Sequence, residues 1–445
     1  MNTANQSDRI TRIPVKPVVI PRDKHIISRS SISDNALKVL YRLKNAGYKA
    51  FLVGGSVRDL LLGREPKDFD VVTDARPEQI RELFRNCHLI GRRFRLAHVR
   101  FGLEIIEVST FRASHNVTAD DDGHSKDGRI LRDNVYGDID DDVWRRDFTV
   151  NALFYNIEDF TVLDYVGAMQ DITDGQLRLI GDPVQRFTED PVRLLRAVRF
   201  AVKLGFRIHP QAEQSIHQLG HLLEEIPPAR LFEEVLKLFM GGYALQTFEM
   251  LRHYDLFKYL FPQTERILNE EEGGFPHMFL IQALKNTDQR ISEEKTVNPA
   301  FLLAALLWEP LQKLANDCMA NGLSEMESIQ LAGDSVISRQ ISGTAMPRRF
   351  TQIAREIWSL QPRLKNRTPK RVLRLTEHPR FRAAYDFLLL RAQAGEAIQD
   401  LADWWTAYLA KTGDKVEADA QKARPHPPRL RRRRRRRGSD KPPSS

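Results

Sequence analysis

Apolar and polar residues follow two different patterns along the chain. Up to about residue 180, short apolar runs at 50–53 and 69–72 and alternating stretches at 95–101 and 104–111 predict β-strands. Helical spacing at 36–43 lies among them. From about residue 191 onward, apolar residues recur with a helical period in long stretches and strand signals are few. The pattern predicts a mixed α/β unit followed by helices.

Composition at the two ends differs from that of the chain between them. Residues 1–28 hold several prolines and no hydrophobic periodicity, and the last residues are polar and then rich in Arg and Pro, so both ends are predicted to be disordered. A Glu- and Gly-rich stretch at 269–276 is a candidate joint between helical lobes. The predicted segments are a disordered start (1–28), the α/β unit (29–180), two helical parts (181–270 and 271–412) and a disordered tail (413–445).

The chain of 445 residues is long enough for several domains, and its 42% hydrophobic and 29% charged residues are typical of a globular protein. It has no long apolar run and no apolar N-terminal segment, so we expect neither a transmembrane helix nor a secretory signal. Cys87 and Cys318 are far apart, which argues against a disulfide framework and a zinc site. These features favour a cytoplasmic location.

Positive charge is concentrated in the C-terminal tail. From Lys422 onward there are eleven basic residues and one acidic residue, which leaves 57 basic and 58 acidic residues before it, so the net charge of +9 comes from the tail. A basic tail on a neutral body predicts salt-dependent, sequence-nonspecific RNA binding, with anionic membrane lipid as the alternative. The RNA-binding candidates in the tail are Arg431, Arg432, Arg433, Arg434, Arg435, Arg436 and Arg437.

The first candidate site combines two glycines with two aspartates. Gly54 and Gly55 lie between a predicted strand and a predicted helix, where glycine lets backbone N–H groups approach a triphosphate. Asp68 and Asp70 are two residues apart at a strand edge, so their carboxylates share one side. Such a pair suits Mg²⁺ and can hold two ions. Alone, the aspartates are more often a solvated strand end, but the combination favours a nucleotidyltransferase site.

Further residues extend this site. Phe69, between the two aspartates, is expected to point into the core. Glu107 interrupts an apolar strand and is the candidate third carboxylate, with Glu104 as its alternative. Arg58 in the predicted helix and Arg112 after the predicted strand are taken as nucleotide-binding candidates.

A second cluster contains Arg146, Asp147 and Asn151. These three side chains face one way if a turn or helix begins at Asp147. Arg146 then suits phosphate, and Asp147 and Asn151 suit ribose hydroxyls. The alternative is that Asp147 only caps a helix whose arginines are solvated.

A third cluster begins with Asp190, which precedes Pro191 and is a good helix N-cap. Arg193, Arg196 and Arg199 recur every three residues and form a basic stripe. Asp190 and Arg193 together offer an acceptor and a forked donor that can read the edge of a base, and Arg196 is a further nucleotide-binding candidate. The alternative is a capped amphipathic helix with a solvated face.

Arg92, Arg93 and Arg95 surround Phe94 between two predicted strands. This group can bind a triphosphate or the 3′ end of an RNA primer, and the three arginines are RNA-binding candidates. The alternative is a basic edge strand whose charges prevent pairing with another sheet.

At these clusters the chain resembles the class II tRNA nucleotidyltransferase and bacterial poly(A) polymerase family, which carries GG-x-VRD, DxD, RRDxxxN and EDxxR in this order. The resemblance implies an α+β fold, with a palm-like α/β head that bears the metals and an all-helical neck, body and arm. It also implies that Asp68 and Asp70 hold Mg²⁺ and that Asp147 is catalytically important. Asp190 and Arg193 would form a protein template for the incoming base.

The resemblance spans roughly residues 25–410 and favours the poly(A) branch of the family over the CCA-adding branch. Stretches at 89–99, 297–305 and 377–386 are similar to those of bacterial poly(A) polymerases, and an arginine-rich tail recurs in that group. Ser56 departs from the pattern, because many relatives carry a third glycine there. A serine is small, so little loss is expected.

The expected function is template-independent addition of AMP from ATP to RNA 3′ ends, which promotes mRNA processing and decay. Expected partners are RNA 3′ ends of any sequence, ATP and RNA-decay proteins, and no stable oligomer is predicted. One alternative is CCA addition to tRNA. Another is RNA binding by a nucleotidyltransferase fold without activity, against which the intact Asp68 and Asp70 pair argues.

Overall fold

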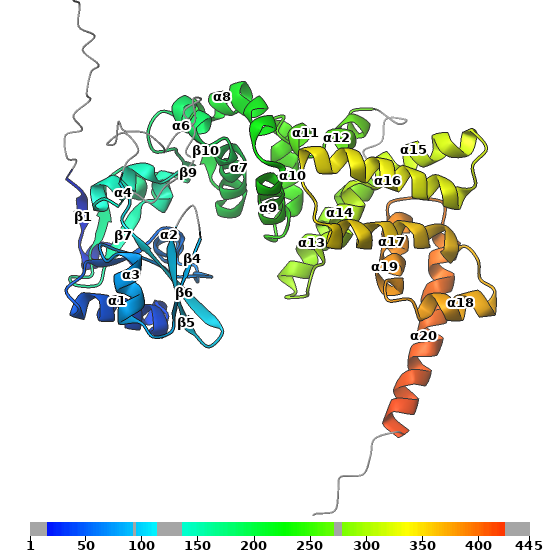
Figure 1. Cartoon of the computed structure of the whole chain (residues 1–445), viewed down its shortest axis with the longest axis horizontal. Helices are drawn as coiled ribbons and strands as arrows, with labels where there is room; N and C mark the ends of the chain where they lie inside the picture. The colour runs from blue at the N-terminus through cyan, green and yellow to red at the C-terminus, as the bar shows by residue number, and fades with distance from the viewer. Residues whose placement is uncertain (1–15, 92–94, 114–135, 271–277, 423–445) are drawn as a thin grey trace, which may run out of the picture. The chain divides into compact units, whose positions relative to one another are not determined.

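Figure 1 shows the computed structural model of the chain, which forms two compact units, Met1–Ser359 and Leu360–Ser445. The structure describes residues 16–91, 95–113, 136–270 and 278–422, with the backbone alone for 413–422.

An eight-stranded sheet organises the start of the first unit, with strand order β1-β8-β7-β2-β3-β6-β5-β4. Its strands are β1 (Val18–Ile20), β2 (Ala50–Val53), β3 (Asp70–Thr73), β4 (Cys87–Ile90), β5 (Leu96–Phe101), β6 (Glu104–Thr110), β7 (Leu153–Asn156) and β8 (Val162–Asp164). The helices around it are α1 (Asp34–Asn45), α2 (Gly55–Leu61), α3 (Pro77–Leu83), α4 (Ile139–Arg145) and α5 (Ala168–Asp174). Only β3 and β6 pair in parallel in this sheet, and the other neighbours are antiparallel.

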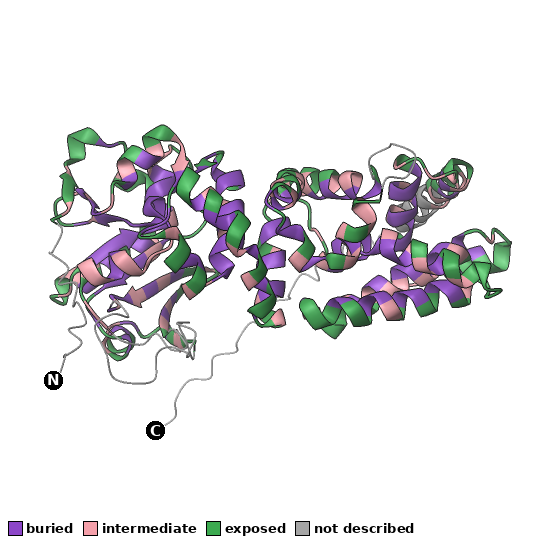
Figure 2. Ribbon diagram, turned by 90° about the horizontal axis from the view of Figure 1, so that it is seen from above, coloured by how far each residue is buried: buried purple, intermediate pink, exposed green. Residues whose placement is uncertain are grey.

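The two faces of the sheet carry separate apolar cores because strand side chains alternate between faces. On one face, Leu40 of α1 and Ile80 of α3 are buried with Val71 of β3. On the other face, Val143 of α4 is buried with Val72 of β3. Figure 2 shows this burial running through the strands and along the inner sides of the helices.

The rest of the first unit is almost entirely helical. Its further elements are β9 (Gln176–Leu177), α6 (Pro183–Glu189), α7 (Val192–Leu204), β10 (Arg207–Ile208), α8 (Pro210–Leu219), α9 (Pro228–Phe239), α10 (Ala244–His253), α11 (Phe257–Leu260), α12 (Pro262–Leu268), α13 (Met278–Ser292), α14 (Pro299–Leu306), α15 (Trp308–Ala320) and α16 (Glu325–Gly343). Among the described residues after 191, β10 is the one departure from the predicted helices. Gly205, with a φ of 73°, ends α7 and turns the chain so that β10 pairs in parallel with β9.

Helix α17 (Arg348–Leu364) spans the division between the units, and the second unit contains α18 (Pro369–Thr376), α19 (Phe381–Gln393) and α20 (Gln399–Lys422). Its core is formed by aromatic and aliphatic side chains, with Trp405 of α20 and Phe381 of α19 in ring contact. The predicted α+β fold class, a sheet-bearing head followed by a long helical region, is confirmed.

The predicted disorder of residues 1–28 is wrong for the described residues from 16 onward. Val18 and Val19 are β-branched and pair with the open edge of β8, and Ile27 is buried. His25 Nε2 lies 2.9 Å from the carbonyl oxygen of Phe160, which fixes the segment after β1. Residues 1–15 lie outside the described part of the chain.

The predicted disorder of residues 413–445 is wrong for the backbone up to Lys422, because α20 continues to that residue. Residues 413–422 contain Ala, Glu, Lys and Gln, and strong helix formers can extend an existing helix without a new nucleation step. Residues 423–445 lie outside the described part. Across the described helices, none has the length and apolar character needed to cross a bilayer.

Asp164, at the end of β8, accepts hydrogen bonds at the start of α5, and a substitution there tests this connection. It is 4% exposed, and its carboxylate accepts hydrogen bonds from the backbone N–H groups of Val166, Ala168 and Met169 at 2.9–3.0 Å. Asp164→Ala should lower the free energy of unfolding by about 1–3 kcal/mol, because buried donors would lose their acceptor. Urea unfolding measures the loss. Asp164→Asn retains one oxygen and should cost less, and equal stability of all three proteins would contradict the assignment.

Candidate active site

Three carboxylates approach one another at the start of β3. Asp70 is the first residue of β3 and is the register partner of Glu107 on β6. Asp68 is exposed in the bend before the strand, and Phe69 is buried in the core as predicted. The pKa of Asp70 is raised to about 6, first by burial and then by the charge of Glu107, and Asp68 adds to the rise. Carboxylates that repel one another in this way suit a divalent cation.

The alternative third carboxylate, Glu104, is engaged elsewhere. Its two oxygens accept hydrogen bonds from Ser33 Oγ at 2.6 Å and from Asn35 Nδ2 at 2.5 Å, at the start of α1. The geometry therefore favours Glu107 over Glu104 as the third carboxylate. Within the described ranges, no three His, Cys, Asp or Glu side chains already form a metal-binding group.

Gly54 and Gly55 form the turn between β2 and α2. Gly54 has a φ of 74° and a ψ of −132°, a conformation that residues with side chains rarely adopt. A Cβ there would lie 3.6 Å from Arg146 Nη1, which is an ordinary contact, so the backbone conformation is what requires glycine. At Gly55 a Cβ would also make only an ordinary contact, with Arg58 Nη2 at 3.5 Å.

Asp147 joins the head to helix α7. Its Oδ2 accepts a hydrogen bond from Arg196 Nε at 2.7 Å, and its Oδ1 accepts from Asn151 Nδ2 at 3.2 Å and from the backbone N–H of Phe148 at 2.9 Å. Burial opposes ionisation of this carboxyl, but the Arg196 charge and these hydrogen bonds outweigh it and lower the pKa of Asp147 to about 2. Asp147 is thus a charged anchor between two elements.

The contacts continue from Asn151 through Arg58 and back to α7. Arg58 Nη1 donates to Asn151 Oδ1 at 2.5 Å, and Arg58 Nε and Nη2 donate to Asp59 Oδ1 at 2.9 and 2.7 Å. Asp59 Oδ2 lies 4.0 Å from Lys203 Nζ on α7, which closes a ring of polar contacts. Arg58 is 2% exposed, so in this structure its role is to hold Asn151 and Asp59 in place through these hydrogen bonds. Its predicted role as a nucleotide ligand stays a prediction.

Phe200 of α7 contacts arginines that belong to, or lie beside, this set of polar contacts. The guanidinium carbons of Arg58, Arg196 and Arg199 are 5.5, 5.2 and 4.9 Å from its ring centroid. Phe148 makes an edge contact with the same ring, with centroids 5.6 Å apart. These distances are within the range of cation–π attraction, so Phe200 stabilises three positive charges that otherwise repel one another. Sequence reasoning missed Phe200, because an aromatic residue on a helix is ordinarily a core residue.

Five arginine side chains crowd together beside the Gly54 turn: Arg112, Arg145, Arg146, Arg186 and Arg193. Burial, followed by the charges of the other four, lowers the pKa of Arg145 to about 9. Burial and the charge of Arg193 lower the pKa of Arg186 to about 10. Crowded, desolvated cations favour the binding of an anion, which would relieve their repulsion.

Two carboxylates compensate part of this charge. Asp142 accepts from Arg146 Nε and Nη2 at 3.0 and 2.8 Å. Glu189 Oε2 accepts from Arg186 Nη1 at 2.7 Å and from Arg193 Nη1 at 3.1 Å. Asp142 and Glu189 thus hold Arg146, Arg186 and Arg193 in ion pairs, within a cluster of guanidinium groups of the kind that suits a polyphosphate.

The predicted base-reading pair lies at the start of α7. Asp190 Oδ2 accepts a hydrogen bond from Arg230 Nη2 on α9 at 2.7 Å, whereas its buried Oδ1 has no partner among the described residues. Arg193 is 6% exposed, and its Nη1 also donates to the carbonyl oxygen of Arg186 at 2.7 Å. Sequence reasoning missed Arg230, because it lies 40 residues after Asp190 and belongs to no recognisable motif.

The remaining RNA-binding candidates are placed only in part. Arg95 is exposed and forms an ion pair with Glu78 of α3, so the structure does not bring it to the carboxylates. Arg92 and Arg93 lie outside the described residues, as do the seven arginines at 431–437. Their predicted contacts with RNA stay predictions.

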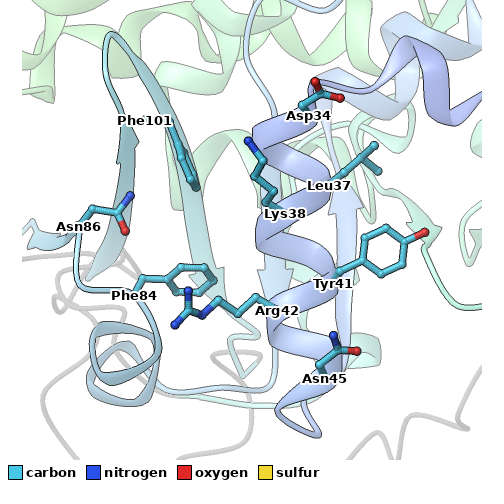
Figure 3. Close-up of a pocket in the computed structure, with 9 residues that line it drawn as sticks. All are labelled: Asp34, Leu37, Lys38, Tyr41, Arg42, Asn45, Phe84, Asn86 and Phe101. Atoms are coloured by element: carbon cyan, nitrogen blue, oxygen red, sulfur yellow. The ribbon is translucent and has the colours of Figure 1, made fainter.

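A groove of about 740 Å³ lies between α1 and the strands β4 and β5, on the α1 side of the sheet (Figure 3). It is lined by Asp34, Leu37, Lys38, Tyr41, Arg42, Asn45, Phe84, Asn86 and Phe101. In Figure 3, Arg42 extends across Phe84, and its guanidinium carbon is 5.3 Å from the ring centroid. Asp70 faces the opposite side of the sheet, since it is two residues from Val72 in the α4 core. The groove is therefore separate from the candidate active site.

Three family models match successive parts of the chain. They are the poly A polymerase head domain at residues 50–178, the probable RNA and SrmB-binding site of polymerase A at 205–268, and the polymerase A arginine-rich C-terminus at 321–439. The chain is 53% identical over 399 residues to the poly(A) polymerase I of Salmonella typhi, covering 88% of this chain and 86% of that protein. The poly(A) polymerase I of Haemophilus influenzae is 46% identical, with 92% of each chain covered.

This chain belongs to the bacterial poly(A) polymerase I family. It is thus a nucleotidyltransferase of the poly(A) polymerase class. A CCA-adding enzyme, from Lactobacillus helveticus, is a more distant relative, at 37% identity over 48% of this chain and 52% of that protein.

Solved structures of CCA-adding and tRNA-processing enzymes share the fold of this poly(A) polymerase family member. The Bacillus stearothermophilus CCA-adding enzyme in complex with CTP matches with a TM-score of 0.54 and 26% identity, over 84% of this chain and 82% of that chain. A tRNA nucleotidyltransferase complexed with a primer tRNA and an incoming ATP analog matches with a TM-score of 0.57 and 25% identity, over 85% and 99% of the chains. The sheet-bearing head and the helical region after it are common to the family.

A substitution at Phe200 tests the contacts that join the head to α7. Phe200→Leu keeps an apolar side chain but removes the aromatic face shared by three arginines, so kcat/KM for ATP should fall about tenfold or more. Steady-state incorporation into an RNA primer, measured with thermal unfolding of the same protein, checks this. Phe200→Tyr keeps the aromatic face and should stay close to wild type. Equal kcat/KM for wild type and Phe200→Leu would contradict the role.

Asp147 gives a pH test. Its folded-state pKa of about 2 lies below the unfolded value, so the stability it contributes is present above about pH 4 and is lost as pH falls towards 2. The contribution at neutral pH is about 2 kcal/mol. The difference in unfolding free energy between wild type and Asp147→Asn should therefore shrink over that window, as urea unfolding at several pH values measures. A difference that stays constant down to the lowest measurable pH would argue against the ion pair with Arg196.

Proposed function

We propose that this family member adds AMP from ATP to RNA 3′ ends without a template, at the site bounded by Asp70, Gly54 and α7. The proposal rests on the position of Arg146. Arg146 joins the two halves of the site, because its charge acts on Asp70 while its Nη1 lies 3.6 Å from the position of a Gly54 Cβ. The carboxylate group, the glycine turn and the arginine cluster thus meet at one place.

We assign Asp68, Asp70 and Glu107 to the binding of Mg²⁺, with two ions expected as in other two-metal transfer sites. The fit rests on the hard oxygen donors of these side chains and on the register pairing that places Asp70 beside Glu107. When bound, Mg²⁺ supplies activation of the 3′-hydroxyl and neutralisation of the leaving pyrophosphate.

The arginine cluster and the glycine turn would hold the triphosphate. Arg146 and Arg112 are the predicted phosphate ligands, and Arg145 and Arg186 add to the same positive field. The backbone N–H groups of the Gly54 turn and the start of α2 would donate to phosphate oxygens. In the reaction, the primer 3′-oxygen bonds to the α-phosphorus as the bond to pyrophosphate breaks. A field that stabilises charge on pyrophosphate favours this step.

Asp190 and Arg193 would select the base. Arg230 holds Asp190 Oδ2, and the buried Oδ1 is an acceptor without a partner among the described residues, so it would accept from the amino group of adenine once nucleotide binding opens access to it. Asp147 accepts hydrogen bonds from both Asn151 and Arg196, so it would orient this reading edge against the triphosphate site.

RNA would be bound by a wider basic surface. The arginine run at 431–437 would hold RNA of any sequence, and polyadenylation would promote processing and decay of mRNA together with RNA-decay proteins. Anionic membrane lipid is the alternative ligand of the tail. The absence of a stable oligomer stays a prediction.

The carboxylates give the direct test. Asp68→Asn and Asp70→Asn should each lower AMP incorporation about a thousandfold or more, because metal binding supplies several kcal/mol of transition-state stabilisation. The assay is extension of an RNA primer with Mg²⁺ and each NTP in turn. Asp174→Asn, an exposed carboxylate on α5, is the matched control and should retain activity.

Two outcomes of the same assay would contradict the proposal. Full activity of Asp70→Asn would refute the metal site. Terminating C-C-A addition to a tRNA that lacks its end, without long A tracts on other RNA, would instead indicate the CCA-adding activity.

A further inference from the structure

The two adjacent tryptophans of α20 have different surroundings. Trp405 is fully buried, contacts Phe381 and donates its indole N–H to the carbonyl oxygen of Leu364 at 3.1 Å. Trp404 is half-buried and stacks on Tyr408, with ring centroids 5.4 Å apart and planes only 9° from parallel. Trp405 lies inside the core of the second unit, whereas Trp404 and Tyr408 pack against the rim of that core and keep part of their rings exposed.

Polar groups beside this aromatic pair are open to a ligand. The indole N–H of Trp404 has no hydrogen-bond partner among the described residues, although its ring is not buried. Arg367 is exposed, and its guanidinium carbon is 5.7 Å from the Trp404 ring centroid, near the outer limit of cation–π attraction. A loosely held guanidinium next to an aromatic pair can be displaced by, or lie alongside, another planar group.

Helix α18 begins two residues after Arg367 and is strongly basic. Its Val372 and Leu375 are buried, while Lys370, Arg371 and Arg374 are exposed and have no carboxylate partner within the described part of the chain. From Arg363 to Arg382 there are eight basic residues and one acidic residue, Glu377. A solvated structural helix ordinarily mixes charges of both signs, so this excess points to an anionic ligand.

We propose that a second RNA-binding site lies on this surface, formed by Trp404, Tyr408 and Arg367 with the basic residues of α18. A base of single-stranded RNA stacks on the aromatic pair, and neighbouring phosphates contact Lys370, Arg371 and Arg374. The inference rests on the proposed function for its ligand, because an enzyme that extends RNA 3′ ends must also hold the RNA behind them. The site lies outside the matched probable RNA-binding region at 205–268 and is independent of the tail arginines.

The chemistry favours RNA over the other polyanions of the cell. An acidic protein surface would pair with the arginines but would leave the flat Trp404 and Tyr408 pair without a planar partner. A membrane needs more apolar area, and Leu373 is the single exposed large hydrophobic residue of α18. Stacking of a base on an aromatic side chain is also stronger than an exposed cation–π contact, so a base can replace Arg367 at the ring.

The test is binding of a fluorescein-labelled oligoadenylate of 12 nucleotides to the full chain, without ATP or Mg²⁺, by anisotropy at several salt concentrations. Trp404→Leu should weaken binding roughly tenfold without changing the salt dependence, because stacking releases no counterions. The double variant Arg371→Gln/Arg374→Gln should reduce the slope of log K against log salt by about 1.4, since each lost phosphate contact of a single strand contributes about 0.7.

Controls separate the site from general effects of charge and folding. Trp404→Phe keeps an aromatic face and should bind close to wild type, which guards against a folding defect in Trp404→Leu. Arg85→Gln/Arg339→Gln removes two exposed positive charges of the first unit that lie outside residues 205–268, and should leave the slope unchanged. In extension assays, Trp404→Leu should raise KM for the primer and leave kcat near wild type, as expected for a residue remote from the chemistry.

Several outcomes would overturn the proposal. Unchanged RNA affinity of a folded Trp404→Leu protein would exclude stacking. Loss of binding to phosphatidylglycerol vesicles with unchanged RNA affinity would assign the surface to lipid instead. Because binding is measured without ATP or Mg²⁺, it is independent of the carboxylate assignment. If Asp70→Asn remains active, the catalytic proposal fails and the binding result still decides the α18 and α20 site.

Discussion

The ion pair between Asp147 and Arg196 is the contact on which the geometry of the site depends. Asp147 lies in the turn after α4, and Arg196 lies on α7, the helix that follows Asp190. Their hydrogen bonds fix the distance between the two sides of the candidate site, which we propose bind the triphosphate and the base. The pKa of Asp147 is depressed because the charge of Arg196 and the hydrogen bonds from Arg196, Asn151 and Phe148 together outweigh the cost of burial. An unpaired charge on either side would be destabilising, so the two elements hold each other.

The ion pair between Asp147 and Arg196 lets the carboxylates and the arginine cluster lie close together without neutralising one another. Asp70 and Glu107 are register partners, and the arginine cluster begins with Arg146 across the Gly54 turn. If these groups were free to move, they would collapse into ion pairs and satisfy each other. Asp142 and Glu189 instead hold Arg146, Arg186 and Arg193 in ion pairs, so these arginines do not collapse onto the carboxylates of β3 and β6.

The sequence predicted those features that depend on local spacing. The α+β fold class and the inward position of Phe69 follow from periods of two and 3.6, and the structure confirms both. It could not separate Glu104 from Glu107, because that choice depends on the parallel register of β6 with β3, which are more than thirty residues apart. Arg230 is likewise a long-range partner. The error at residues 16–28 has the same origin, since a three-residue strand forms only because β8 offers an edge.

The adjacent tryptophans of α20 show why burial must be known before an aromatic residue is given a role. On a helix, neighbouring residues point about 100° apart, so one of two adjacent tryptophans can enter the core while the other stays at its rim. The sequence alone does not show this difference in burial, because both residues are tryptophan. In the structure, Trp405 bonds to Leu364, whereas Trp404 keeps an unpaired N–H beside Arg367. A half-buried tryptophan retains surface that its partners have not used, and the basic helix next to it makes RNA the ligand that best fits that surface.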